Sequence, residues 1–91
     1  MSFFARDMTV GALIQKLQED FGIRVKESDK VLADAAGNMY RPRSLIRLVP
    51  PAGRIVVPLR LPDDDVLTPS MIVFLCRRLR VPPSHFGIFV H

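Results

Sequence analysis

Near the N-terminus, apolar residues recur at helical spacing. The members of this stripe are Val10, Leu13, Ile14, Leu17 and Phe21. Such spacing places side chains on one face of a helix, which we expect at about residues 10–21. Thr9 is a suitable N-cap, and Gly22 can take the left-handed conformation that ends a helix. The pattern therefore predicts an amphipathic helix.

Short β-rich runs separated by turn residues come next. We expect strands at residues 23–26, 30–34, 38–40, 45–49 and 54–61. The alanines and glycine of residues 35–37, and the prolines and glycine of residues 50–53, are typical of turns. Pro58 has no amide hydrogen to donate to a ladder, so the last strand is expected at an edge or with a bulge.

A second helix is predicted after the strands. Thr68 is its expected N-cap, and Pro69 suits the first helical position. Its core stripe is Ile72, Leu75, Cys76 and Leu79. Two prolines at residues 82–83 end it. Residues 84–91 are predicted as either a short strand or a turn that packs phenylalanines against the core.

This order of elements predicts the fold class. We expect one α+β domain over residues 1–91, with α-β-β-β-α order and two helices packed on one face of an antiparallel sheet. The other face would meet solvent or a partner. The 48% hydrophobic and 24% charged content is typical of a globular protein. No apolar run approaches the roughly 20 residues that cross a bilayer, so no membrane partner is expected.

Charge is unevenly distributed along the chain. Residues 1–40 carry five basic and six acidic groups, a net of −1, whereas residues 41–91 carry eight arginines and three aspartates, a net of +5. Alternation along the last two strands predicts that the apolar sets face the helices, namely Ile46 and Leu48 in the first strand and Ile55, Val57, Leu59 and Leu61 in the second. The open face would then carry Arg43, Arg47, Arg54 and Arg60, with Arg41 near its end if the strand extends that far.

Three interpretations of this arginine face stay open. Guanidinium groups could contact the phosphates of RNA, or the carboxylates of an acidic protein partner. The face could also be solvated and bind nothing. Few aromatic residues accompany the arginines, which argues against a platform for stacking single-stranded bases.

Candidate catalytic and metal-binding residues are sparse. Cys76 is expected to be a packed core thiol, and one cysteine excludes an internal disulfide, which fits a reducing, cytoplasmic location. His85 and His91 have no second type of metal ligand nearby. Asp63, Asp64 and Asp65 are interpreted as a solvated loop. The sequence therefore predicts no metal and no cofactor, and it favours a protein that is not an enzyme while leaving an enzyme open.

Three segments of the second half resemble a known family. They are Arg54-Ile-Val-Val-Pro-Leu-Arg60, Leu67-Thr-Pro-Ser70 after an acidic link, and Pro82-Pro-Ser-His-Phe86. Together they resemble HicA-type toxins, small mRNA interferases of bacterial toxin–antitoxin pairs whose fold is similar to double-stranded-RNA-binding domains. The resemblance implies α-β-β-β-α order, RNA binding and an antitoxin-like protein partner.

The chain departs from this family at the catalytic residue. The family has a histidine in a Gly-Ser-His motif at the start of the middle strand, and the matching position here is about Ser44. Serine cannot replace imidazole as a general base near neutral pH, which favours a non-catalytic binding module. Two alternatives remain: a ribonuclease that uses His85 as its base, and an accessory protein that acts only through protein contacts.

Overall fold

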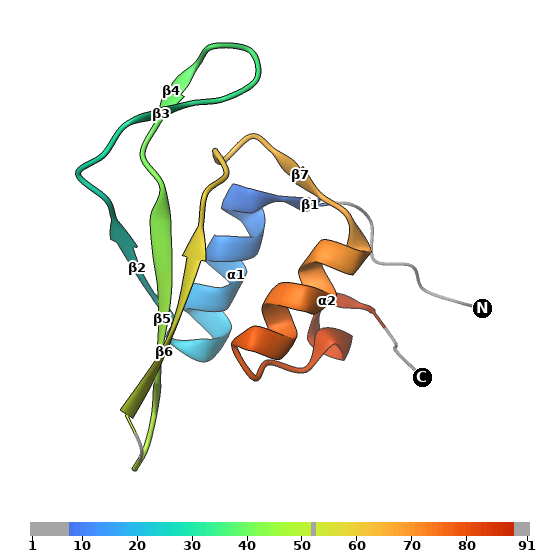
Figure 1. The fold of residues 1–91 in the computed structure, drawn as a ribbon. Coiled ribbons are helices and arrows are strands. Elements are labelled where there is room, and N and C mark those ends of the chain that lie inside the picture. Colours follow the sequence, from blue (N-terminus) through green and yellow to red (C-terminus); the bar gives the residue numbers. More distant parts are fainter. Residues whose placement is uncertain (1–7, 52, 89–91) are drawn as a thin grey trace.

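The computed structural model describes residues 8–51 and 53–88, and its two helices lie on one side of a small sheet (Figure 1). The elements are β1 (Met8–Thr9), α1 (Val10–Phe21), β2 (Arg24–Glu27), β3 (Leu32–Ala33), β4 (Met39–Tyr40), β5 (Arg43–Val49), β6 (Gly53–Leu59), β7 (Val66–Leu67), α2 (Pro69–Arg78) and the 3₁₀ helix η1 (Pro83–Phe86). The antiparallel sheet has the order β2-β5-β6, so the predicted α+β class is confirmed.

Both helices begin at the predicted caps. Thr9 accepts a hydrogen bond from the Ala12 amide at 3.2 Å, and Thr68 accepts one from the Met71 amide at 3.4 Å. Each threonine satisfies an amide that has no partner within its own helix. At the end of α1, Gly22 has a φ of 63°, in the left-handed region that glycine adopts freely.

After α2, the described residues up to 88 form a turn rather than a strand. After α2 the chain passes through Arg80, at a φ of 56°, and enters η1. Phe86 is half-buried and packs against the core, as expected. Phe89 and His91 lie outside the described residues.

A single apolar core lies between the sheet and the helices. Leu45 of β5 and Val57 of β6 are register partners, and both are buried. They pack with the buried stripes of α1 and α2, and no polar or charged residue of the described chain is fully buried. Pro58 lies on β6, an edge strand, as predicted.

Two small strand pairs supplement the sheet. The predicted β3–β4 hairpin forms, and Figure 1 shows it extending beyond the sheet. The β1–β7 pair was not predicted; it joins Thr9 to Val66 and Met8 to Leu67. Because these residues directly precede α1 and α2, the pair holds the starts of the two helices together.

The predicted orientation of β5 is wrong. Register pairs place Arg43 opposite Leu59 and Arg47 opposite Ile55, so both arginines lie on the helix-covered side. Only Leu45 between them enters the core from this strand. The covered face is short along β5, and long arginine stems reach polar groups at its two ends. The prediction for β6 is correct, because Val57 and Leu59 are buried.

Candidate functional site

Arg47 is tied to the end of α2. Its Nη1 atom donates to the carbonyl oxygens of Leu79 at 2.7 Å and Arg80 at 2.6 Å. Its guanidinium carbon also lies 5.6 Å from the centre of the Phe21 ring, within cation–π range. The side chain therefore joins β5, α1 and α2, and does not belong to the open face.

Arg43 is held at the other end of the same strand. It forms an ion pair with Asp63 and donates from Nη2 to the Leu61 carbonyl at 3.3 Å. Its side chain is only 12% exposed. Arg43 and Arg47 thus satisfy carbonyl and carboxylate groups within the fold, which leaves the predicted arginine face without two of its members.

The other three predicted arginines lie elsewhere. Arg54 is exposed on the open face, directly opposite Leu48. Arg60 follows β6 and is exposed, and Tyr40 Oη donates to its carbonyl at 2.9 Å. Arg41 precedes β5 and donates from Nη1 to the Asp29 carbonyl at 3.1 Å. The structure therefore keeps Arg54 and Arg60 on the open side of the sheet.

The open face has an apolar centre. Register places Ile46 opposite Val56 and Leu48 opposite Arg54, with Pro58 further along β6. Leu48 is 58% exposed and Val56 is 43% exposed. Adjacent strands thus leave a continuous group of apolar side chains uncovered. Such a group was not predicted, because Ile46 and Leu48 were assigned to the core.

The border of this centre is basic. Arg24 pairs with Ile46 and Lys26 pairs with Ser44, so both β2 side chains lie on the open face. In the described chain, the charged residues at open-face positions of β2, β5 and β6 are Arg24, Lys26 and Arg54. All of them are basic. The alternation Arg24-Val25-Lys26 carried this signal, since Val25 packs against the core and directs its neighbours outward.

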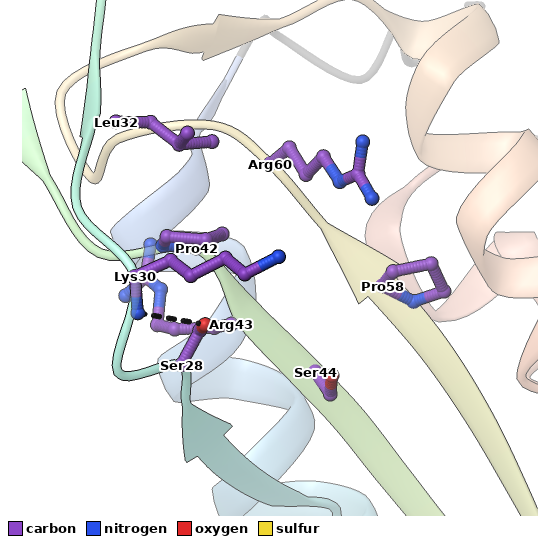
Figure 2. A pocket seen from close by; sticks show the side chains of 8 residues that line it. All are labelled: Ser28, Lys30, Leu32, Pro42, Arg43, Ser44, Pro58 and Arg60. Atoms are coloured by element: carbon purple, nitrogen blue, oxygen red, sulfur yellow. Dashed lines mark hydrogen bonds between the residues drawn. The ribbon is translucent and has the colours of Figure 1, made fainter.

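A hollow of about 340 Å³ lies where the segment before β3 meets the ends of β5 and β6. Figure 2 shows Lys30 extending across it from one side and Arg60 on the other. Its full lining is Ser28, Lys30, Leu32, Pro42, Arg43, Ser44, Pro58 and Arg60. These residues offer hydroxyl, ammonium and guanidinium donors and include no carboxylate, so the hollow suits an anionic group.

Hydrogen bonds fix the walls of the hollow. The Ser28 amide donates to the Pro42 carbonyl at 2.8 Å, and Ser28 Oγ accepts from the Lys30 amide at 3.1 Å. Arg41 holds the neighbouring carbonyl of Asp29. These contacts tie residues 28–30 to the start of β5 and so hold the walls of the hollow in place.

His85 lies on the helix side of the sheet, away from the open face. Its Nε2 atom is 2.6 Å from Asp20 Oδ2, and its ring packs edge-on against Phe21. The hydrogen bond from His85, with a smaller contribution from Lys16, lowers the pKa of Asp20 below its ordinary value of 3.8. This pair is separate from the residues that line the hollow.

The remaining candidates have structural roles. Cys76 is buried in the core, and burial raises the pKa of its thiol to about 11. In the acidic segment, backbone carbonyls accept hydrogen bonds from the start of α1: the Gly11 amide donates to the Asp63 carbonyl, and the Val10 amide donates to the Asp65 carbonyl. Over residues 8–51 and 53–88 no group of three or more potential metal ligands is present.

No protein-family model, curated protein or solved structure matches the chain. The similarity to HicA-type toxins therefore stays a prediction based on the three sequence segments. Within the described part of the chain, neither α1 nor α2 has the length and apolarity to cross a membrane.

Proposed function

We propose that this domain is a non-catalytic binding module that docks an acidic protein partner on the open face of its sheet. The observation that carries the proposal is the arrangement of that face: exposed Leu48 and Val56 beside half-buried Ile46 at the centre, with basic side chains around them.

The apolar centre favours a protein as the ligand. Contiguous exposed apolar side chains on a small domain mark interaction sites, and the centre of a protein interface is depleted in charge while its rim is polar. Leu48 and Val56 lie on adjacent strands and present their side chains to the same side. A partner that covers them would remove apolar surface from water.

The basic border favours an acidic partner. Arg24, Lys26 and Arg54 would meet carboxylates around the apolar contact, and the hollow between Lys30 and Arg60 would accept a further one. Charge pairs at an interface rim increase the association rate and the selectivity for oppositely charged partners.

RNA is the alternative ligand, and the face suits it less well. Phosphates would contact the basic border, but the apolar centre carries no aromatic ring on which a base could stack. Two observations support a module without catalysis. Ser44 stands at about the position where the HicA-type toxins, which the chain resembles, have histidine, and His85 is paired with Asp20 on the helix side.

A phage-displayed library of random peptides, panned on the purified domain, tests the proposal. Enriched peptides should combine Asp or Glu with Leu, Ile or Val, and should lose binding to the Leu48→Ser/Val56→Ser variant and to the Arg24→Glu/Arg54→Glu variant. Arg80→Glu is the charge control because Arg80 follows α2 and lines none of the surfaces above. Circular dichroism would verify that every variant is folded.

Filter binding of a double-stranded RNA, at low and high salt, provides the second arm. Tight RNA binding that weakens steeply with salt and depends on Arg24 and Arg54 would replace the protein interpretation with the RNA one. Enriched peptides that bind all variants equally would overturn the proposal, as would a library with no enrichment.

A further inference from the structure

A second uncovered apolar surface lies on the other side of β6, along α2. A groove of about 400 Å³ runs between the segment that follows β6 and the outer face of the helix. Its lining is Pro58, Leu59, Arg60, Leu61, Leu67, Ser70, Met71, Phe74 and Leu75. The groove shares only Pro58 and Arg60 with the hollow on the open face.

Apolar side chains of α2 form one wall of this groove. Phe74 is 57% exposed and Met71 is 41% exposed, and the two lie three residues apart on the same helix face. The stripe that α2 buries in the core is a different one, namely Ile72, Leu75 and Cys76. Within residues 8–51 and 53–88, the Met71–Phe74 ridge is therefore left uncovered.

Arginines surround this ridge. A neighbouring hollow of about 450 Å³ shares Ser70 and Phe74 with the groove and adds Val73, Arg77 and Arg78. The guanidinium carbon of Arg78 lies 5.7 Å from the centre of the Phe74 ring, which holds the charge beside the aromatic surface. Arg60 borders the groove on the β6 side. Neither lining includes an acidic residue.

We propose that this groove binds the apolar face of an acidic amphipathic helix from a partner protein. Helices dock in apolar grooves through side chains at i, i+3, i+4 and i+7, and the Met71–Phe74 ridge has the spacing that packs between such side chains. Carboxylates flanking the apolar stripe would meet Arg60, Arg77 and Arg78. A second copy of this chain, docked symmetrically through the same surface, would present the same lining of apolar and basic side chains, which includes no carboxylate to pair with Arg60, Arg77 and Arg78.

A synthetic peptide provides a direct test. It is a fluorescein-labelled helix of about 18 residues, five turns, with leucine at the i, i+3, i+4 and i+7 positions and glutamate at most others. The matched peptide has lysine in place of glutamate. Fluorescence anisotropy at low salt should show at least about tenfold tighter binding of the acidic peptide.

Variants of the domain locate the binding. Phe74→Ala should weaken binding of the acidic peptide at least about tenfold, as expected for truncation of an aromatic anchor. Arg77→Glu should also weaken binding of the acidic peptide, and the affinity that remains should depend less on the salt concentration. Val66→Ala removes an exposed apolar side chain outside the groove and should bind as the wild type does. The Leu48→Ser/Val56→Ser variant should also bind normally, which separates this groove from the open face.

The outcomes are decisive because the truncated side chains are largely exposed. In thermal melting, the Phe74→Ala variant should unfold at the same temperature as the wild type. A loss of peptide binding would then be due to the change in the groove and not to unfolding. Equal binding of the two peptides, or undiminished binding to Phe74→Ala, would overturn the proposal. Sedimentation equilibrium that shows a wild-type dimer dissolved by Phe74→Ala would assign the groove to a second copy and overturn it too.

Discussion

Arg47, in the middle strand of the sheet, donates a hydrogen bond of 2.7 Å to the carbonyl of Leu79, just after the last residue of α2. The last carbonyls of a helix have no partner within the helix, and a cation at that end is electrostatically favoured. The same Nη1 atom donates to Arg80, so one guanidinium connects the sheet to the turn between α2 and η1.

Replacing Arg47 should therefore destabilise the fold. We expect Arg47→Ala to lower the free energy of unfolding by about 1.5–3 kcal/mol, the range for hydrogen bonds to a charged group. Arg54→Ala, on the exposed face, is the matched control and should change it by less than about 0.5 kcal/mol. Urea denaturation measures both values. Equal effects of the two variants would mean that the contact at the end of α2 contributes no stability.

Arg43 should be more tolerant of an apolar substitute than of truncation. Its Nε atom is buried and has no hydrogen-bond partner in the described chain, and its ion pair with Asp63 requires a desolvated guanidinium. Methionine keeps the volume of the arginine stem and removes the unsatisfied donor. The free energy of unfolding of Arg43→Met should therefore lie within about 1 kcal/mol of the wild-type value.

Truncation of Arg43 gives the comparison. Arg43→Ala should cost about 1–2 kcal/mol more than Arg43→Met, because it leaves a cavity beside the core. Asp63→Ala should also cost more than Arg43→Met, since it leaves the guanidinium without its carboxylate. A methionine variant that is the least stable of the three would show that the charge itself stabilises this corner.

Local chemistry allowed much of the fold to be predicted. Thr9, Gly22, Thr68 and Pro69 each act within one helical turn, so the two helices begin, and α1 ends, where their sequences predict. Pro58 likewise indicated an edge strand, because a missing amide hydrogen restricts a residue whatever surrounds it.

Orientation of the middle strand depended on distant residues instead. Along β5, both alternating sets contain apolar residues, and the inward set is flanked by arginines. Groups more than fifteen residues away in sequence, among them the carbonyls of Leu79 and Leu61 and the carboxylate of Asp63, make an inward arginine favourable. The candidate site changed as well: Arg54 and Arg60 stayed on the open side. Arg24 and Lys26 joined them from β2, a strand that was predicted at residues 23–26 but whose outward side chains had not been assigned to the open face.

Acid should weaken the contact between α1 and η1. Hydrogen bonding from His85, followed by Lys16, lowers the pKa of Asp20 in the folded state below 3.8. Stability from this carboxylate is therefore fully present above the unfolded pKa, and is lost as the pH falls through the lower folded value. The urea midpoint of the wild type should thus decline more between about pH 5 and pH 2.5 than that of Asp20→Asn.

Glu27→Gln, a carboxylate exposed on β2, is the matched control for Asp20→Asn. The control should follow the wild-type decline. If Asp20→Asn follows it as well, the pair with His85 does not couple protonation to folding.

Cys76 should report global unfolding. The thiolate is the reactive form, and burial raises the pKa of this thiol to about 11, while α2 and the core cover the sulfur. We expect iodoacetamide at about pH 8 to modify the native protein orders of magnitude more slowly than the urea-unfolded chain. Labelling followed by mass spectrometry measures both rates. Native labelling at the unfolded rate would place the thiol at the surface.

Pro58 should protect the free edge of the sheet. An exposed edge strand offers unpaired backbone groups to a second molecule, and proline removes one donor from that edge. β6 is an edge strand, and Pro58 is exposed on it beside the uncovered Val56. Valine at this position restores the amide hydrogen and adds an apolar side chain. We therefore expect Pro58→Val to stay folded and to self-associate at concentrations where the wild type is monomeric.

Analytical ultracentrifugation over a range of concentrations distinguishes the two causes of this association. The control is Ser44→Val, which adds apolar surface at the register partner of Pro58 but on the central strand, where no edge is available. Association of Pro58→Val alone would assign the effect to backbone pairing at β6. Equal association of both variants would instead assign it to the apolar surface of the open face, and two monomeric variants would show that the edge needs no protection.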